Sequence, residues 1–189
     1  MAAGATPAEG TPAAPDPAVA RLLRTLRRSF DGEAWHGPSL GAALAGCSAD
    51  EAAARPVPGA HTVWELVLHA TAWTDEVAAR TAGGRPGLPA VGDWPAVASP
   101  PDAASWAAAR AELDAARDRL FAAVAAVDPA RLDAPLPEPT TSQANVGGDG
   151  AGGRDTLHET IVGLAEHNAY HGGQVALLRR AYAAGAGRA

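Results

Sequence analysis

Apolar residues along this chain recur at steps of three and four, which is the spacing that places them on one face of an α-helix. The apolar fraction is 47%, much of it alanine, the residue with the highest helix propensity. Phe and Tyr are scarce, and β-branched residues form no alternating run of the kind that predicts a strand. A length of 189 residues is enough for one domain with a substantial core. We therefore expect an all-α fold in a single domain.

The periodic segments predict long helices separated by turn signals. A capping box at Thr62-Val-Trp-Glu65 begins the second helix, a serine cap at Ser99 begins the third, and Thr156 with Glu159 begins the fourth. Short helices are expected in the first connection, residues 37–54, where Ser48-Ala-Asp-Glu51 is another capping box. The four long helices are expected at about residues 17–30, 62–82, 99–127 and 155–182.

Three segments are expected to lie outside the packed helices. Residues 1–16 are mostly Ala, Pro, Gly and Thr and carry few apolar anchors, which predicts a disordered tail. The domain then spans residues 17–184, and residues 185–189 form a C-terminal tail. The connection 134–153 is rich first in proline and then in glycine, and it is longer than compact domains usually contain. Both a lid and a disordered segment fit that composition.

The charge balance excludes some classes of function. The formal net charge is −6, and the one cluster of basic residues, Arg24, Arg27 and Arg28, is typical of a solvated helix face, so nucleic-acid binding is not expected. No apolar stretch approaches the ~20 residues that span a bilayer, and the start of the chain has no signal-peptide pattern. We expect a cytoplasmic protein without a membrane partner. Arginine is the only basic residue besides histidine, which with the Ala, Gly and Pro richness suggests a bacterial gene of high GC content.

A single cysteine, Cys47, excludes an internal disulfide and any site with several cysteine ligands. Its position in Gly46-Cys47-Ser48 is typical of a small packing residue at the start of a short helix. We favour that interpretation over a nucleophile.

Two histidines near the C-terminus, His167 and His171, are one helical turn apart. Their Cβ atoms would be about 5 to 6 Å apart, so both rings can lean toward one ion. His69 shares a face with Leu66 and Trp73 at the spacing i, i+3, i+7 and is expected to point into the bundle as a third ligand. His158 is nine residues before His167 and is expected to face solvent. The alternative is that the three inward histidines are core residues satisfied by hydrogen bonds. Burying them without partners would cost about 1 to 3 kcal/mol each, which favours metal ligation.

Three segments together resemble the DinB-like superfamily of four-helix-bundle metalloproteins. They are residues 64–73, containing His69; residues 167–174, containing His167 and His171; and the segment Trp35 to Leu40. Trp94 and Trp106 also lie where one branch of that family tends to carry tryptophan. The resemblance covers about residues 19 to 182. It implies an up-down four-helix bundle that often dimerises, and a divalent metal held by His69, His167 and His171.

The resemblance also implies a class of activity, since characterised relatives include transferases and isomerases that depend on bacillithiol, mycothiol or glutathione. We expect a metal-dependent enzyme that activates a low-molecular-weight thiol and transfers it to an electrophilic small molecule, with mycothiol favoured if the host is an actinobacterium. The metal can be Zn, Ni, Fe or Mn. Alternatives are a hydrolase or isomerase that uses a metal hydroxide, a non-catalytic protein that binds a metal or small molecule, and a structural dimer with a vestigial site.

Further residues are candidates for supporting roles. Gln174 can bind a ligand or cross-link helices. His36 can transfer protons at the pocket mouth, although a structural hydrogen bond is the favoured interpretation. Glu65 can orient a ligand, but its position favours a helix cap. Glu76 can orient a ligand or face solvent. Trp73 is expected in the core. Gly172 and Gly173 cost about 1 kcal/mol each inside a helix relative to alanine, which predicts close approach of another backbone.

Overall fold

The computed structural model describes residues 15–97, 101–140 and 155–186, and every named element within them is a helix. Four are long: α1 (Pro17–Phe30), α4 (Val63–Thr81), α5 (Ala103–Ala125) and α6 (Leu157–Ala186). Three are short: α2 (Leu40–Leu44), α3 (Ala49–Ala53) and the 3-10 turn η1 (Pro129–Arg131). The predictions of an all-α fold and of short helices in the first connection are confirmed.

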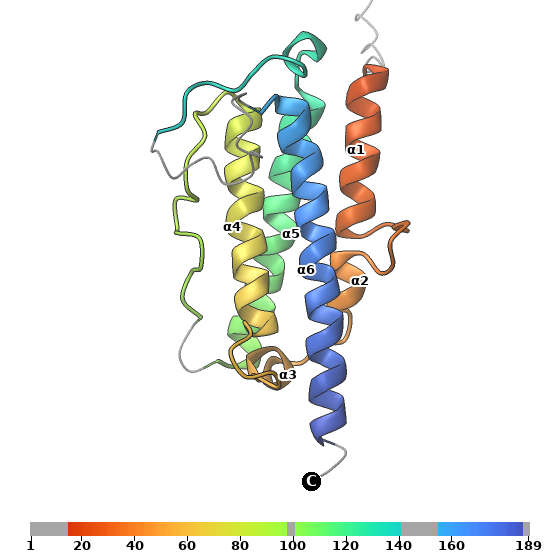
Figure 1. Cartoon of the computed structure of the whole chain (residues 1–189), viewed down its shortest axis with the longest axis vertical. Coiled ribbons are helices and arrows are strands. Elements are labelled where there is room, and N and C mark those ends of the chain that lie inside the picture. The colour runs from red at the N-terminus through yellow and green to blue at the C-terminus, as the bar shows by residue number, and fades with distance from the viewer. Residues whose placement is uncertain (1–14, 98–100, 141–154, 187–189) are drawn as a thin grey trace, which may run out of the picture.

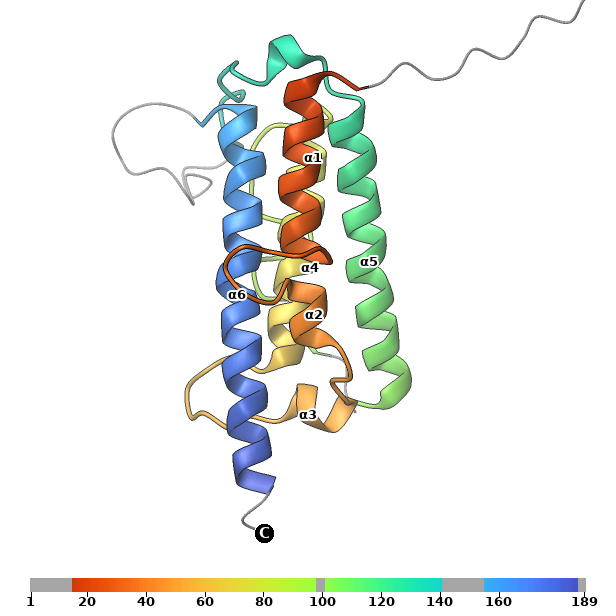
Figure 2. The same ribbon diagram turned by 90° about the vertical axis from the view of Figure 1, so that its right-hand side faces the viewer.

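The four long helices pack side by side. Helix α4 packs against α5 and α6, and α1 packs against the same two helices from the other side (Figures 1 and 2). Helix α2 lies beyond the end of α1 and packs against α6, and α3 packs against α4 and α5. The long helices therefore enclose a shared core, and α6 contacts the first half of the chain along most of its length.

The direction of the helices differs from a simple up-down order, because α4 and α5 run the same way. Trp64 and Trp106, near the starts of these helices, have ring centroids 5.2 Å apart. Further along, Arg119 donates to Asp75 at 2.9 Å. The reason is the long connection after α4, whose described part (82–97) runs back along the outside of the bundle (Figure 1). Only short loops force neighbouring helices to be antiparallel.

Side-chain caps begin the long helices. The predicted capping box of α4 is present, with Glu65 N–H donating to Thr62 Oγ1 at 3.1 Å and Thr62 N–H donating to Glu65 Oε2 at 2.7 Å. Thr156 and Glu159 make the same pair of bonds at α6. At α5 the prediction was wrong, since Asp102 is the cap and its Oδ1 accepts from Ser105 N–H at 2.7 Å. Ser99 lies outside the described residues.

The inward face of α6 follows the predicted spacing. Leu157, Ile161, Asn168 and Val175 are each at most 1% exposed. Asn168 is polar, and its amide donates to Ser29 Oγ on α1 at 3.3 Å. At the other end of α6, Arg179 donates to Glu51 and to the carbonyl oxygens of Ala43 and Ala45 at the end of α2. These bonds hold α6 in register with the first half of the chain.

Cys47 is buried, and burial is the main cause that raises the pKa of its thiol to about 11. A neutral, enclosed thiol is a poor nucleophile, in agreement with the predicted packing role. In the described part of the chain, no helix is both long and apolar enough to cross a membrane.

Parts of three predicted segments lie outside the described residues: 1–14 of the N-terminal tail, 141–153 of the long connection, and 187–189 of the C-terminal tail. The described start of the connection is attached to the rest of the molecule. Leu136 N–H donates to Asp155 O at 2.9 Å, and Thr140 N–H donates to Pro86 O at 2.8 Å.

Gly172 and Gly173 of α6 differ in their surroundings. A Cβ at Gly172 would lie 3.8 Å from the Leu40 Cα, which is ordinary contact. A Cβ at Gly173 would meet nothing within 4 Å, and Gly173 is exposed. The prediction of close backbone approach is therefore wrong for Gly173, whereas at Gly172 the backbone of Pro38 and Leu40 does lie against α6, with room for a methyl group.

Replacing Gly173 by alanine is predicted to raise the free energy of unfolding by about 1 kcal/mol, because alanine loses less conformational entropy in a helix interior. Urea denaturation of the two proteins measures the difference. The matched control is Gly46→Ala, which adds the same methyl group in open space but at φ 69°, where a side chain is strained. It should lower stability by about 1 kcal/mol or more. Destabilisation by Gly173→Ala would contradict this account of α6.

Candidate metal centre

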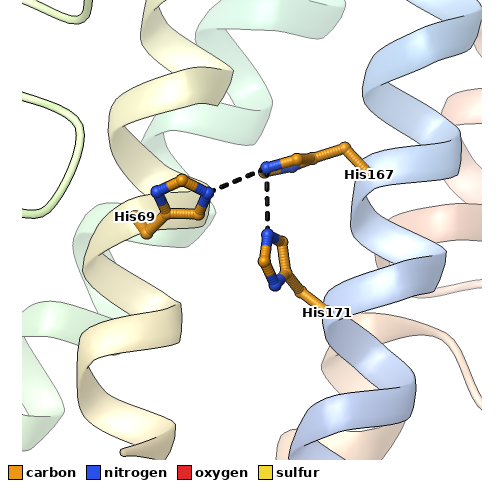
Figure 3. Close-up of side chains that lie close together, drawn as sticks. All are labelled: His69, His167 and His171. Carbon is orange, nitrogen blue, oxygen red and sulfur yellow. Dashed lines mark hydrogen bonds between the residues drawn. The ribbon is translucent and has the colours of Figure 1, made fainter. Parts of the chain in front are cut away.

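Three histidines meet between α4 and α6, as Figure 3 shows. His69 comes from α4, and His167 and His171 come from successive turns of α6. The Nε2 of His167 lies 2.9 Å from Nε2 of His69 and 3.0 Å from Nε2 of His171. The three residues form a group whose candidate ligand atoms all lie within 4.8 Å of one another. The structure thus brings together the three ligands that the sequence predicts.

Two of the rings have a defined tautomer. His69 Nδ1 lies 2.7 Å from the backbone oxygen of Asp93, and His171 Nδ1 lies 2.7 Å from Gln174 Oε1. A carbonyl oxygen only accepts, so each Nδ1 carries the proton, and each Nε2 directs a lone pair toward the centre of the group. Hydrogen bonds of this kind orient histidine ligands in metal sites.

His167 completes the set of donors. Its Nδ1 is buried and has no hydrogen-bond partner within the described residues. A single proton on its Nε2 cannot fully satisfy the lone pairs of both neighbouring rings, whereas a cation at the centre would accept one lone pair from each ring. Nitrogens bound at about 2.0 to 2.1 Å to one ion lie about 2.8 to 3.4 Å apart in octahedral or tetrahedral geometry, a range that includes the two separations from His167 Nε2. The residues therefore fit a divalent metal ion.

The electrostatics keep all three rings neutral. Burial is the largest cause that lowers the pKa of His69, of His171 and of His167. The pKa of His167 falls to about 3, because burial and, in addition, the two neighbouring histidines disfavour a positive charge on this ring. Metal ligation needs neutral imidazole, so the protein prepares the ligand form of each ring near neutral pH.

Aromatic rings surround the histidines on two sides. Trp94 stacks on His69 at a centroid distance of 4.0 Å, and it stacks on His61 at 3.5 Å. Trp73 lies edge-on to His69 at 6.4 Å, and Tyr170 lies edge-on to His171 at 5.1 Å. Trp73 is 9% exposed, as expected for a core residue, but its indole also borders the centre.

A pocket of about 780 Å³ opens beside the three histidines, between α4 and α6. Trp73, Val77 and Arg80 line it from α4, and His167, Gly163 and Tyr170 are among the residues that line it from α6. The α4 residues recur at steps of four, four and three from His69, so they form one continuous wall. A molecule in this pocket would reach the centre directly.

The structure gives Gln174, Glu65 and Glu76 three different roles. Gln174 orients His171, and Glu65 is a helix cap that also pairs with Arg55 at 2.8 Å. Glu76 pairs with the buried Arg80 at 3.0 Å and accepts from Gly87 N–H, so it is neither a ligand-orienting residue nor a free surface charge.

His36 and His158 contribute no ring to the centre. His36 is exposed in the loop after α1, is not among the described residues that line the pocket, and has no hydrogen-bond partner among them. The structure therefore shows neither a position of His36 at the pocket mouth nor the predicted hydrogen bond within the described residues, and a role of His36 in proton transfer stays a prediction. His158 is exposed, as predicted, at the edge of the pocket.

Sequence reasoning missed Asp93. It lies in a loop with no helical periodicity, and its backbone oxygen rather than its residue type contacts His69. The family pattern marks the neighbouring Trp94 but does not indicate that it stacks on a candidate ligand.

Comparison with known families gives one match. The family model described as the DinB superfamily matches residues 35–175, a span that includes all three histidines and both of the motifs around them. No curated protein and no solved structure matches the chain.

The stability of the metal-free protein is predicted to fall as the pH decreases below about 6.5, the usual histidine pKa in an unfolded chain. The folded pKa values are lowered, so in this range the unfolded chain takes up protons that the folded chain excludes, and unfolding becomes easier. For His167 the pH range over which stability falls extends down to about pH 3, the pKa of its ring in the folded protein. Urea denaturation of chelator-treated protein at a series of pH values measures the slope.

His167→Gln is the control for this prediction, because glutamine does not titrate while every other acid-sensitive group remains. Its stability should depend less steeply on pH than that of the unchanged protein. Equal slopes for the two proteins would contradict the predicted neutral state of His167.

Proposed function

The chain belongs to the DinB superfamily, and from that premise we propose that it binds a divalent metal ion through the Nε2 atoms of His69, His167 and His171. The observation that carries the proposal is the convergence of three neutral rings at Nε2 separations of 2.9 and 3.0 Å, two of them with their protons held on Nδ1. Three imidazoles leave at least one coordination position open on Zn²⁺, and more on octahedral Ni²⁺, Fe²⁺ or Mn²⁺.

We further propose that the protein is an enzyme that activates a low-molecular-weight thiol and transfers it to an electrophilic small molecule. A bound divalent ion favours the deprotonated form of a thiol or of water. The thiolate sulfur then forms a bond to the electrophilic carbon, the leaving group departs with its bonding electrons, and the thiol proton passes to solvent. No cysteine of the chain is needed, which agrees with the buried and neutral state of Cys47.

The chain's own residues would hold the reactants. Trp73 and Val77 supply an apolar wall next to the histidines, and burial of the rings keeps bulk water from most of the centre. A volume of about 780 Å³ is in the range of pockets that bind small molecules, which supports a small-molecule substrate. Arginine as the only long basic residue, together with the Ala, Gly and Pro richness, favours mycothiol as the thiol if the host is an actinobacterium.

Protein purified without an added metal or a histidine tag is predicted to carry roughly one divalent ion per chain. Elemental analysis measures the content. His167→Ala should lose most of the metal, because two imidazoles bind much more weakly than three. His158→Ala removes an exposed histidine from the same helix and should retain it. Metal retained in His167→Ala, or a protein that binds none after dialysis against Zn²⁺ or Ni²⁺, would rule out the site.

Turnover of an alkyl or aryl halide is predicted to require both a thiol and the metal. The assay compares mycothiol, bacillithiol and glutathione with a reaction that contains no thiol, and it follows loss of the free thiol. His69→Ala should reduce the rate at least 100-fold. Thiol-independent hydrolysis or isomerisation of test substrates would refute the transferase proposal and favour the hydrolase or isomerase alternative. A protein that binds metal and small molecules without turning them over would favour the binding-protein alternative.

A further inference from the structure

We infer that Asp93 and Trp94, on the connection between α4 and α5, are positioning residues of the metal centre. They hold the His69 ring in the orientation and tautomer that ligation needs, and Trp94 covers the side of the centre that faces away from the pocket. This inference rests on the proposed function, because it concerns how the same three histidines are prepared for an ion.

Asp93 is attached to two successive turns of α4. Its backbone oxygen accepts the Nδ1 proton of His69 at 2.7 Å, and its carboxylate oxygen Oδ1 accepts the indole Nε1 proton of Trp73 at 2.7 Å. The same Oδ1 lies 3.3 Å from His69 Nδ1. The bond to Trp73 therefore holds the residue whose backbone oxygen orients His69. Loss of that bond would leave the backbone oxygen free to move away from the ring.

Trp94 fixes the plane of the His69 ring. The two rings are inclined by only 10° at a centroid distance of 4.0 Å, and Trp94 is also stacked on His61, inclined by 4°. Its edge-on contact with His171 is 6.5 Å from centroid to centroid. Trp94 is not among the described residues that line the pocket, whereas Trp73, His167 and Tyr170 are. The indole therefore covers the centre from the side that the pocket does not occupy.

The connection between α4 and α5 is also attached to the bundle at a second point, so hydrogen bonds at Gly87 and at Asp93 together hold this part of it beside His69. Gly87 N–H donates to Glu76 Oε1 at 2.8 Å, and Gly87 O accepts from Arg80 at 2.9 Å. Both ends of the segment from Gly87 to Trp94 thus contact side chains of α4. Ligands held in place before binding lose less entropy when the ion arrives, so these contacts should raise metal affinity.

The affinity for Zn²⁺, measured by competition with a chelating dye, tests this inference. Asp93→Ala and Trp94→Ala should each weaken binding by about 10-fold or more, the range found for outer partners of metal ligands. Asp93→Asn keeps an oxygen that can accept from Trp73, and Trp94→Phe keeps a ring that can stack, so both should recover most of the affinity. Val91→Ala, on the same connection and 68% exposed, and Trp35→Ala, 99% exposed, are controls that should bind as the unchanged protein does.

A second measurement separates positioning from a general effect on stability. Long-range ¹H–¹⁵N spectra of the metal-free protein show which ring nitrogen carries the proton. His69 should be protonated on Nδ1 in the unchanged protein and become a mixture of tautomers in Asp93→Ala. Trp73→Phe removes the same anchoring hydrogen bond, so combining it with Asp93→Ala should weaken Zn²⁺ binding no further than the weaker-binding single variant.

The outcomes distinguish this inference from the proposed function. If the unchanged protein binds Zn²⁺ and His69→Ala abolishes binding, while Asp93→Ala and Trp94→Ala bind within about 2-fold of it, the positioning role is wrong and the metal site stands. A lower melting temperature with unchanged Zn²⁺ affinity and an unchanged His69 tautomer also overturns it. If the unchanged protein does not bind Zn²⁺, Ni²⁺, Fe²⁺ or Mn²⁺, the proposed function itself fails.

Discussion

The convergence of three buried imidazoles from two helices is the constraint on which the arrangement of this molecule depends. Neutral histidines are costly to bury without partners, and the Nδ1 of His167 has none within the described residues. A cation that accepts one lone pair from each Nε2 would satisfy those three atoms, which the single proton available on His167 Nε2 cannot do. The rest of α4 and α6 can be understood as the framework that holds His167 Nε2 about 3 Å from the Nε2 atoms of His69 and His171 while keeping each ring neutral.

The parallel course of α4 and α5 follows from the same requirement. A short turn after α4 would reverse the chain at once and place no residue beside His69. The long connection orders more residues, which costs conformational entropy, but its described part returns along α4 and brings Asp93 to the Nδ1 of His69. The topology of the bundle thus supplies a hydrogen-bond partner that neither of the two ligand-bearing helices provides for that ring.

Residue spacing predicts the helices well because periodicity reports which face each residue occupies. The spacing of Leu66, His69 and Trp73 was enough to place His69 inward, and the step from His167 to His171 placed both rings on one side of α6. Spacing contains no information on where a loop goes. For that reason the direction of α5 and the contact of Asp93 had to come from the structure. Trp94 shows the same limit, since a family pattern locates the residue but not the ring on which it stacks.

The charges around the pocket decide where an anionic reactant would bind. Arg80 lines the pocket, but its guanidinium is paired with Glu76 at 3.0 Å and both side chains are nearly buried, so its charge is compensated. Its role is to hold Gly87. The described pocket-lining residues include no other arginine, while Asp93, Asp155, Glu159 and Glu166 are acidic. An ion held by the three histidines would therefore be the strongest uncompensated positive charge in the pocket, and a thiolate would be drawn to it rather than to the walls.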